Sequence, residues 1–347
     1  MSDVVEKIED IAVSKSGAGD TEEKKAVVQR PPSPALEDDK DDEKESKGTA
    51  KEDWTLADCG VALDDYEVNL EHERLGVIEG LEGLHQVECL CLRNNLVRRM
   101  ENLSMLTTLT ELDLYDNILK KIEGIETLVN LEILDLSYNN IRKIENIENL
   151  TKLRKLFLAG NKISKIENIE TLTSLTMIEL GANRIRKIEN LETIKGLQEL
   201  YLGKNKIAKM ENLDVCPELS LVDLQNCRIL EIDGLDQLTN LTSLHLAHNG
   251  ITEIKNLEKN LDLDTIDLSG NPIKSLAGLD GLDHLEDLWM NDCKIEDWKE
   301  VEKLTARPQL RTVYLERNPI YKDKMYRKKI ILTCPQLTQI DATSVRS

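Results

Sequence analysis

Residues that most often carry chemistry are few and scattered in this sequence. His245 and His248 lie close together, but no carboxylate or cysteine ligands join them to complete a metal site. Cys89 and Cys91 alternate on one predicted strand, where surface or partly covered thiols are favoured over a metal site. The phosphate-loop, HExxH and GxSxG patterns do not occur. We therefore predict that the chain is not an enzyme and holds no metal or cofactor.

A much stronger pattern is a phrase that returns every 22 residues. Residues 139–148 read NNIRKIENIE, residues 161–170 read NKISKIENIE, and residues 183–192 read NRIRKIENLE. The register is LxxLxLxxNxI, which is the signature of a leucine-rich repeat. Its Asn slot recurs at intervals of 22 residues, followed by a last interval of 25. The slot holds Asn95, Asn117, Asn139, Asn161, Asn183, Asn205, Cys227, Asn249, Asn271, Cys293 and Asn318.

The repeat predicts a specific kind of coil. Leu156 and Leu158 alternate as a short strand with inward side chains, and apolar residues at triplet spacing follow Asn161. The Asn amide is suited to bond backbone groups where the chain leaves the strand. One repeat buries too little to fold alone, so neighbours must stack. We predict an α/β solenoid: a right-handed leucine-rich-repeat superhelix with short parallel concave strands, 3₁₀ or extended convex turns, and a cap at each end.

Four segments are predicted along the chain. Residues 1–52 carry an excess of Asp and Glu and little apolar surface, which predicts a disordered acidic tail. Residues 53–83 are predicted to form an N-terminal cap and a degenerate repeat with Glu73 in the Asn slot. Residues 84–320 hold eleven repeats, mostly of 22 residues, and residues 321–347 form a C-terminal cap.

The end of the chain departs from the regular repeat. Residues 296–304, EDWKEVEKL, predict a convex helix, and Trp298 occupies an inward slot that predicts a core side chain. The final segment resembles the C-terminal cap of intracellular leucine-rich proteins. The residues that carry this resemblance are Asn318-Pro319, Tyr326-Arg327, Pro335-Gln336-Leu337 and Asp341.

Candidate binding residues come from the strand positions that alternate with the inward leucines. The position four residues before each slot faces outward along the predicted concave sheet and contains four of the eleven aromatic residues. Aromatic side chains among carboxylates favour a protein-binding surface over strand packing alone. The column reads Cys91, Asp113, Asp135, Phe157, Glu179, Tyr201, Asp223, His245, Asp267, Trp289 and Tyr314.

A second column, four residues after the slot, is basic in six successive repeats. Glu often stands two residues further on, so a solvated edge with charge pairing is favoured over a docking ridge. The column reads Arg99, Lys121, Lys143, Lys165, Lys187 and Lys209, and then Glu231 and Glu253.

A more specific resemblance comes from the KIEN repeats, the phrases LDLYDN, GKNKI, LERNP and WMND, and the ending QIDATSVR. Over about residues 66–347 the chain resembles the leucine-rich-repeat regulatory subunits of protein phosphatase 1. The resemblance implies a non-catalytic subunit whose concave face binds the phosphatase catalytic subunit and regulates its activity, maturation or localisation. It also implies residence in nucleus and cytoplasm, and a ternary complex with a small inhibitory phosphatase subunit. The docking positions that it implies are Asp135, Phe157, Glu179, Tyr201, Asp267, Asp287, Trp289 and Tyr314; at Tyr201 relatives are expected to have Phe.

Composition and the absence of certain motifs limit the classes of function that the chain can have. The net charge of −20 argues against direct nucleic-acid binding, and no apolar run approaches the length of a membrane span. The seven cysteines show no CxxC pair, which indicates reduced thiols. The short [RK]-[VI]-x-[FW] segment used by most phosphatase regulators is missing, so docking must fall to the sheet. The alternative function is a leucine-rich-repeat adaptor of a ribonucleoprotein or cytoskeletal complex.

Overall fold

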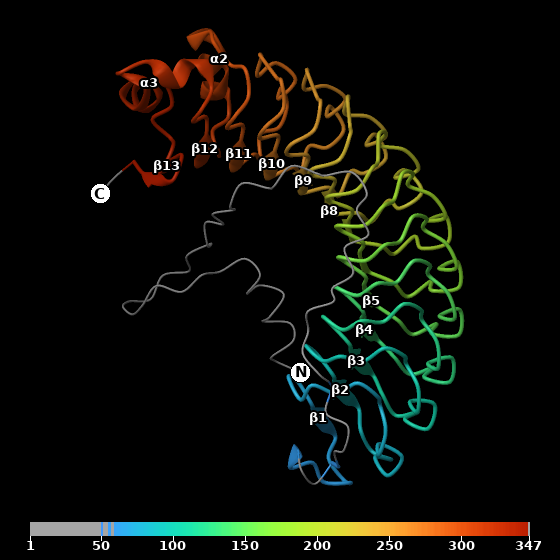
Figure 1. The fold of residues 1–347 in the computed structure, drawn as a ribbon. Coiled ribbons are helices and arrows are strands. Elements are labelled where there is room, and N and C mark those ends of the chain that lie inside the picture. The colour runs from blue at the N-terminus through green and yellow to red at the C-terminus, as the bar shows by residue number, and fades with distance from the viewer. Residues whose placement is uncertain (1–49, 51–54, 57–58, 346–347) are drawn as a thin grey trace. The chain divides into compact units, whose positions relative to one another are not determined.

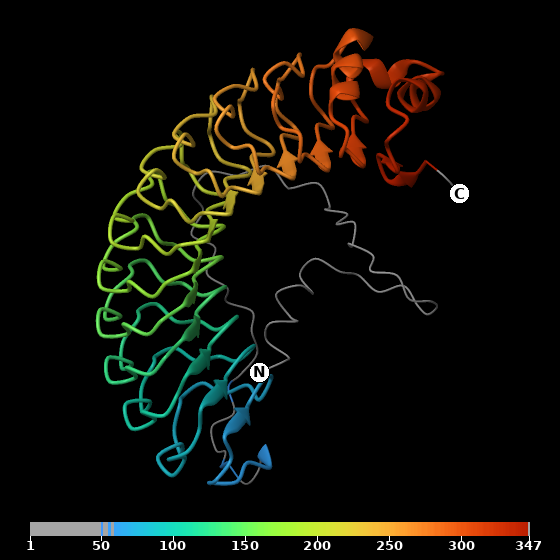
Figure 2. The ribbon, with the colours of Figure 1, turned by 180° about the vertical axis from the view of Figure 1, so that it is seen from behind.

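A computed structural model describes residue 50, residues 55–56 and residues 59–345 of the chain. These residues belong to one compact unit, Ser46–Ser347, and the predicted acidic tail at 1–52 lies almost entirely outside them. Their coils stack side by side along an arc, and the strands line the inner, concave side of that arc (Figure 1). The opposite view shows the turns on the outer, convex side (Figure 2).

The strands form one sheet in which each pairs with its neighbours in sequence order. Each pairs in parallel with the next, apart from the antiparallel last pair, and Leu134 opposite Leu156 illustrates the 22-residue register. The predicted sheet of short parallel strands is therefore confirmed. The strands are β1 (Glu67–Asn69), β2 (Cys89–Cys91), β3 (Glu111–Asp113), β4 (Ile133–Asp135), β5 (Lys155–Phe157), β6 (Met177–Glu179), β7 (Glu199–Tyr201), β8 (Leu221–Asp223), β9 (Ser243–His245), β10 (Thr265–Asp267), β11 (Asp287–Trp289), β12 (Thr312–Tyr314), β13 (Gln339–Ile340) and β14 (Thr343–Ser344).

The convex side is built mainly from tight turns. In the regular repeats they close with bonds such as that from the Leu128 amide to the Ile125 carbonyl, at 2.9 Å. The longer last interval leaves room for a helix, and the helix predicted at 296–304 is confirmed as α2 (Trp298–Glu302). Asp297 caps it by accepting a hydrogen bond from the Lys299 amide. The remaining elements are the 3₁₀ helices η2 (Lys303–Ala306) and η3 (Pro319–Lys322), and the helix α3 (Tyr326–Thr333).

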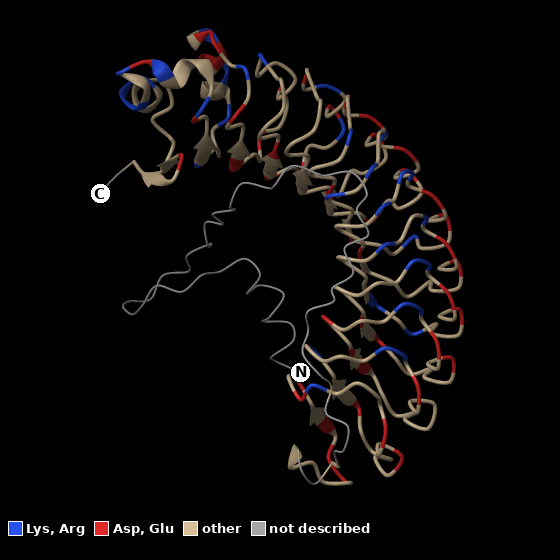
Figure 3. Cartoon of the chain, viewed as in Figure 1, with Lys and Arg blue, Asp and Glu red and all other residues tan. Residues whose placement is uncertain are grey.

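A continuous apolar core runs through the stacked coils. Each repeat contributes the same inward positions, while charged residues lie outside the core, on the outer rim, on the segments beside the strands and on the concave strands themselves (Figure 3). The neighbouring coil covers what each repeat cannot cover for itself, which is the basis of solenoid stability. In the repeat around Asn161 the predicted core residues are all at most 1% exposed: Leu153, Leu156, Leu158, Ile163, Ile166, Ile169 and Leu172.

Asparagine side chains form a buried hydrogen-bond ladder between the coils. The Asn161 amide nitrogen donates to the carbonyls of Leu136 and Leu158 at 2.9 and 3.1 Å. Its oxygen accepts from the Ile141 amide of the preceding coil at 3.0 Å. Cys227 replaces this amide with one thiol contact, to the Leu202 carbonyl at 3.5 Å. The slot residue therefore satisfies backbone groups that the strand leaves unpaired.

Replacing Asn161 with alanine should lower the free energy of unfolding by about 2–4 kcal/mol, because several buried backbone groups lose their partner. Asn161→Cys is the matched control and should cost less, since Cys227 keeps one such contact in an equivalent slot. Urea denaturation of both variants measures the difference. Equal stability of Asn161→Ala and the parent chain would show that the ladder contributes nothing.

Both ends of the array are covered. At the N-terminal end β1 extends the sheet, and Leu56 is buried in the core with only 8% exposed. At the C-terminal end β14 turns back on β13 and covers the edge. The Asp341 carboxylate accepts hydrogen bonds from the Leu315 and Glu316 amides, both at 2.9 Å.

Trp298 does not lie in the core, so that prediction was wrong. Its side chain is half-buried at the start of α2. The ring centroids of Trp298 and Tyr326 lie 6.3 Å apart, and the Lys329 ammonium lies 4.7 Å from the Trp298 ring centroid. The repeat register ends where the helix begins, and the indole consequently packs between the last repeat and the cap.

Candidate protein-binding face

The predicted binding residues share the concave face of the sheet. All but one are the third residue of a strand, and strand pairing places them in one column with neighbours about 5 Å apart. Asp287 is the first residue of β11, on the same face as Trp289, and pairs with Thr312. The residues are Asp135 on β4, Phe157 on β5, Glu179 on β6, Tyr201 on β7, Asp267 on β10, Asp287 and Trp289 on β11, and Tyr314 on β12.

This column is less exposed than the sequence predicted. Phe157 is only 6% exposed and Asp267 only 4%, while the other predicted binding residues are half-buried. Curvature brings side chains on the inner side of an arc together, so neighbours in the column cover one another. The prediction that Phe157 faces solvent was therefore wrong, although its place in the column was predicted correctly.

An aromatic cluster occupies the C-terminal part of the face. The Trp289 ring lies 6.1 Å from the His245 ring and 6.3 Å from the Tyr314 ring, which it meets edge to face. The Trp289 indole nitrogen is buried and has no hydrogen-bond partner among the described residues. The Tyr314 hydroxyl accepts a bond from the Gln339 amide at 2.9 Å. The cluster presents apolar rings with their positions set by mutual packing.

In the middle of the face, acidic and phenolic groups lie close together. The Tyr201 hydroxyl donates to the Glu199 carboxylate at 2.8 Å. Burial raises the pKa of Tyr201, and the negative charge of Glu199 raises it further. Burial likewise raises the pKa of Glu179, with a contribution from the charge of Asp223. A cationic group of a partner placed here would relieve this concentration of negative charge.

The column aspartates also have a structural role that sequence reasoning missed. The Asp135 carboxylate accepts a hydrogen bond from the Ser137 amide at 2.8 Å, so it stabilises the turn after its own strand. Asp267 makes the same contact with the Ser269 amide at 3.0 Å. An Asp side chain that accepts a hydrogen bond from the amide two residues later is a known turn motif. The repeated LDL phrases could therefore have predicted these contacts.

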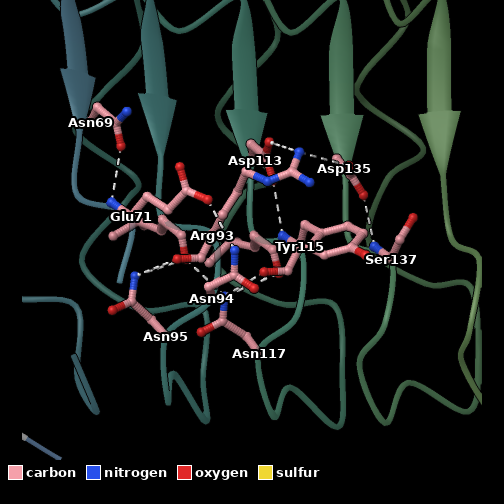
Figure 4. Close-up of polar contacts among 12 residues, drawn as sticks. Asn69, Glu71, Arg93, Asn94, Asn95, Asp113, Tyr115, Asn117, Asp135 and Ser137 are labelled. Atoms are coloured by element: carbon pink, nitrogen blue, oxygen red, sulfur yellow. Dashed lines mark hydrogen bonds and ion pairs between the residues drawn. The ribbon is translucent and has the colours of Figure 1, made fainter. Parts of the chain in front are cut away.

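A second feature that was not predicted is an ion-pair cluster around Arg93 (Figure 4). One guanidinium nitrogen lies 2.9 Å from the Asp113 carboxylate and 3.9 Å from that of Asp135. The guanidinium also stacks on the Tyr115 ring at 4.2 Å, and that ring lies 5.0 Å from the Tyr138 ring. These contacts join side chains from three successive repeats, which no local sequence pattern connects.

One positive charge in this cluster serves two carboxylates. Burial, together with the negative charge of Asp113, raises the pKa of Asp135 to about 7. A carboxyl whose pKa is higher in the folded chain than its ordinary value near 4 binds its proton more tightly when folded. The stability that it contributes is therefore present at low pH and is lost as the pH rises from about 4 to about 7.

Asp135→Asn should consequently stabilise the chain by about 1–2 kcal/mol at pH 8, and the gain should vanish towards pH 4. Asp267→Asn is the matched control, because it keeps the turn contact but has His245 and Trp289 as column neighbours. Urea denaturation at pH 4.5, 6 and 8 measures both variants. A gain for Asp135→Asn that is the same at all three pH values would contradict the raised pKa.

The described residues contain no group of three or more His, Cys, Asp or Glu side chains placed to hold a metal ion. All seven cysteines are free, with Cys89 and Cys91 half-buried on β2. Burial raises the pKa of the Cys91 thiol to about 11, which disfavours the nucleophilic thiolate. Among the described residues, none of the helices has the length and apolar character needed to span a bilayer.

The stacked coils, the asparagine ladder and the concave sheet are the architecture of a leucine-rich-repeat solenoid. A family model described as Leucine Rich repeats (2 copies) matches it in three overlapping stretches, at residues 107–149, 129–172 and 151–193. Among solved structures, an internalin (inlF) from Listeria monocytogenes superposes with a TM-score of 0.72. The superposition covers 81% of this chain and 83% of the internalin chain at 24% sequence identity. At this identity the similarity shows the fold alone.

Curated relatives share a higher sequence identity with this chain, over a shorter stretch. Protein phosphatase 1 regulatory subunit 7 of Xenopus tropicalis is 56% identical over 52 residues, which is 15% of this chain and 15% of the relative. The protein of the same name from Homo sapiens is 50% identical over 52 residues, or 15% of this chain and 14% of the relative. The match thus spans about one seventh of these relatives. Within that span it confirms the resemblance to phosphatase regulatory subunits that the sequence predicted.

Proposed function

We propose that this chain is a non-catalytic regulatory subunit that binds the catalytic subunit of protein phosphatase 1 through its concave face. The observation that carries the proposal is the identity of 50–56%, over 52 residues, to proteins named protein phosphatase 1 regulatory subunit 7. The binding face comes from the column of aromatic and acidic side chains on the sheet. Binding would regulate the activity, maturation or localisation of the phosphatase.

The face combines the two features expected of a protein-binding surface. Half-buried rings such as Trp289 and Tyr314 supply apolar anchors that exclude water from the centre of an interface. Carboxylates such as Glu179 and Asp287 supply charges for lysine or arginine side chains of the partner. The sheet holds both kinds of group on a rigid framework, so little conformational entropy is lost on binding.

Two further parts of the proposal come from the resemblance. We propose that the chain works in both nucleus and cytoplasm, and that a small inhibitory phosphatase subunit joins the complex. The concave face would then be occupied by the catalytic subunit, while the inhibitory subunit would contact the complex elsewhere.

Affinity purification of the full chain, followed by mass spectrometry, tests the function. We expect the phosphatase catalytic subunit among the captured proteins, and we expect a Trp289→Ala and Tyr314→Ala double variant to lose it. Leu332→Ser is a suitable control, because Leu332 is 81% exposed on the C-terminal cap. Capture of spliceosomal or microtubule proteins without the phosphatase would instead favour the adaptor function.

A further inference from the structure

One flank of the solenoid, next to the ends of the strands, is strongly basic. In the six repeats with slots from Asn95 to Asn205, the apolar side chains at the second and fifth positions after the slot are buried, as Ile163 and Ile166 show. The first, third and fourth positions are half-buried or exposed, apart from Leu96, which is 8% exposed. Lys and Arg gather on these segments between the strands and the outer rim, whereas Asp and Glu gather toward the rim (Figure 3).

We call these positions, in the six repeats with slots from Asn95 to Asn205, the basic flank. Thirteen of its eighteen residues are Lys or Arg, and none is Asp or Glu, in a chain with a net charge of −20. In the next two repeats the fourth position is acidic instead, with Glu231 and Glu253. The cations are Arg98, Arg99, Lys120, Lys121, Arg142, Lys143, Lys162, Lys165, Arg184, Arg186, Lys187, Lys206 and Lys209.

Neighbouring glutamates neutralise only part of this flank. Arg99 pairs with Glu123 at 3.0 Å, and Lys165 lies 4.0 Å from Glu167. In contrast, Arg184, Arg186 and Lys187 form no ion pair within the part of the chain that the structure describes, although Glu189 follows two residues later. The predicted edge of paired charges is thus wrong for the repeat that follows Asn183.

The spacing of the flank suits an extended acidic chain. Successive coils lie about 5 Å apart, so like charges stack at a distance where they repel and attract counterions. We propose that the basic flank binds an extended segment rich in Asp and Glu on a partner polypeptide. The acidic rim and the overall charge of −20 oppose a long polyanion such as nucleic acid, whereas one peptide strand fits a ridge bordered by acids.

This surface differs from the concave face and does not depend on the proposed phosphatase function. The concave column lies before the Asn slot on the strands, whereas the basic flank lies after it. A partner on the flank therefore leaves Trp289 and its neighbours accessible, so the two surfaces can be occupied together.

Fluorescence anisotropy with a labelled ten-residue peptide of alternating Asp and Glu tests the proposal on the full chain. We expect binding at 50 mM NaCl that weakens at least tenfold at 300 mM, because exposed charges are screened. The triple variant Arg184→Glu, Arg186→Glu and Lys187→Glu should lose at least tenfold in affinity at low salt.

A matched variant separates a local effect from a change in total charge. It carries Lys152→Glu, Lys195→Glu and Lys259→Glu, which reverse three exposed lysines of the convex turns. This variant and Trp289→Ala should bind the peptide within threefold of the parent chain, and circular dichroism checks that each variant is folded.

Three results would overturn the proposal. One is the absence of peptide binding at 50 mM NaCl, and another is an equal loss of affinity in the two triple variants. The third is tighter binding of a ten-nucleotide single-stranded DNA than of the peptide, which would assign the flank to nucleic acid.

Discussion

Replacing Trp289 with alanine is expected to weaken binding of the phosphatase catalytic subunit by about 2–4 kcal/mol, a loss of roughly 30-fold to 1,000-fold in affinity. The indole is the centre of the aromatic cluster, between the rings of His245 and Tyr314. Its ring contacts are worth about 1–2 kcal/mol of folding free energy, so the variant should remain folded. Titration calorimetry gives the affinity, and a thermal melt gives the stability.

Trp298→Ala is the control for this experiment. Trp298 is also half-buried and packs against an aromatic ring, but it lies on α2 beside the C-terminal cap. Its removal should cost folding stability and leave phosphatase affinity unchanged. Normal binding by folded Trp289→Ala protein would show that the cluster does not contact the phosphatase.

Deleting residues 321–347 should lower the melting temperature by more than 10 °C or cause aggregation. The deletion removes buried side chains such as Tyr326, Ile330 and Ile340, each worth about 2 kcal/mol. It also exposes the strand edge of β12, which pairs with β13 in the intact chain. Differential scanning calorimetry with light scattering measures both effects.

Asp341→Ala tests the same cap without a deletion. It removes the acceptor of the Leu315 and Glu316 amides and of the Tyr326 hydroxyl, so it should give an intermediate loss of stability. Leu332→Ser on the exposed side of α3 should give none. An unchanged melting temperature after the deletion would mean that the last repeat needs no cover.

The repeat made the fold and the candidate column on the concave face predictable from the sequence. Because every coil has the same length, the position four residues before the Asn slot had to become one column, and the pairing of Asp135 with Phe157 and of Phe157 with Glu179 agrees. The strand register and the α2 helix followed from the same counting.

The features that could not be predicted from the sequence depend on contacts between different coils. The burial of Phe157 comes from curvature, which no single repeat encodes. The contacts of Arg93 with Asp113 and Asp135 join residues 20 and 42 positions apart through side-chain direction. The environment of Trp298 depends on how the cap packs, where the repeat no longer sets the register.

The most direct test of the concave binding face is site-specific photo-crosslinking to the phosphatase catalytic subunit. Benzoylphenylalanine replaces Tyr201 at the centre of the face in one variant, and Met105 on a convex turn, where the side chain is 62% exposed, in another. We expect crosslinks from position 201 and none from position 105. Crosslinks from position 105 but not from position 201 would contradict this expectation, because the phosphatase would then bind the convex side.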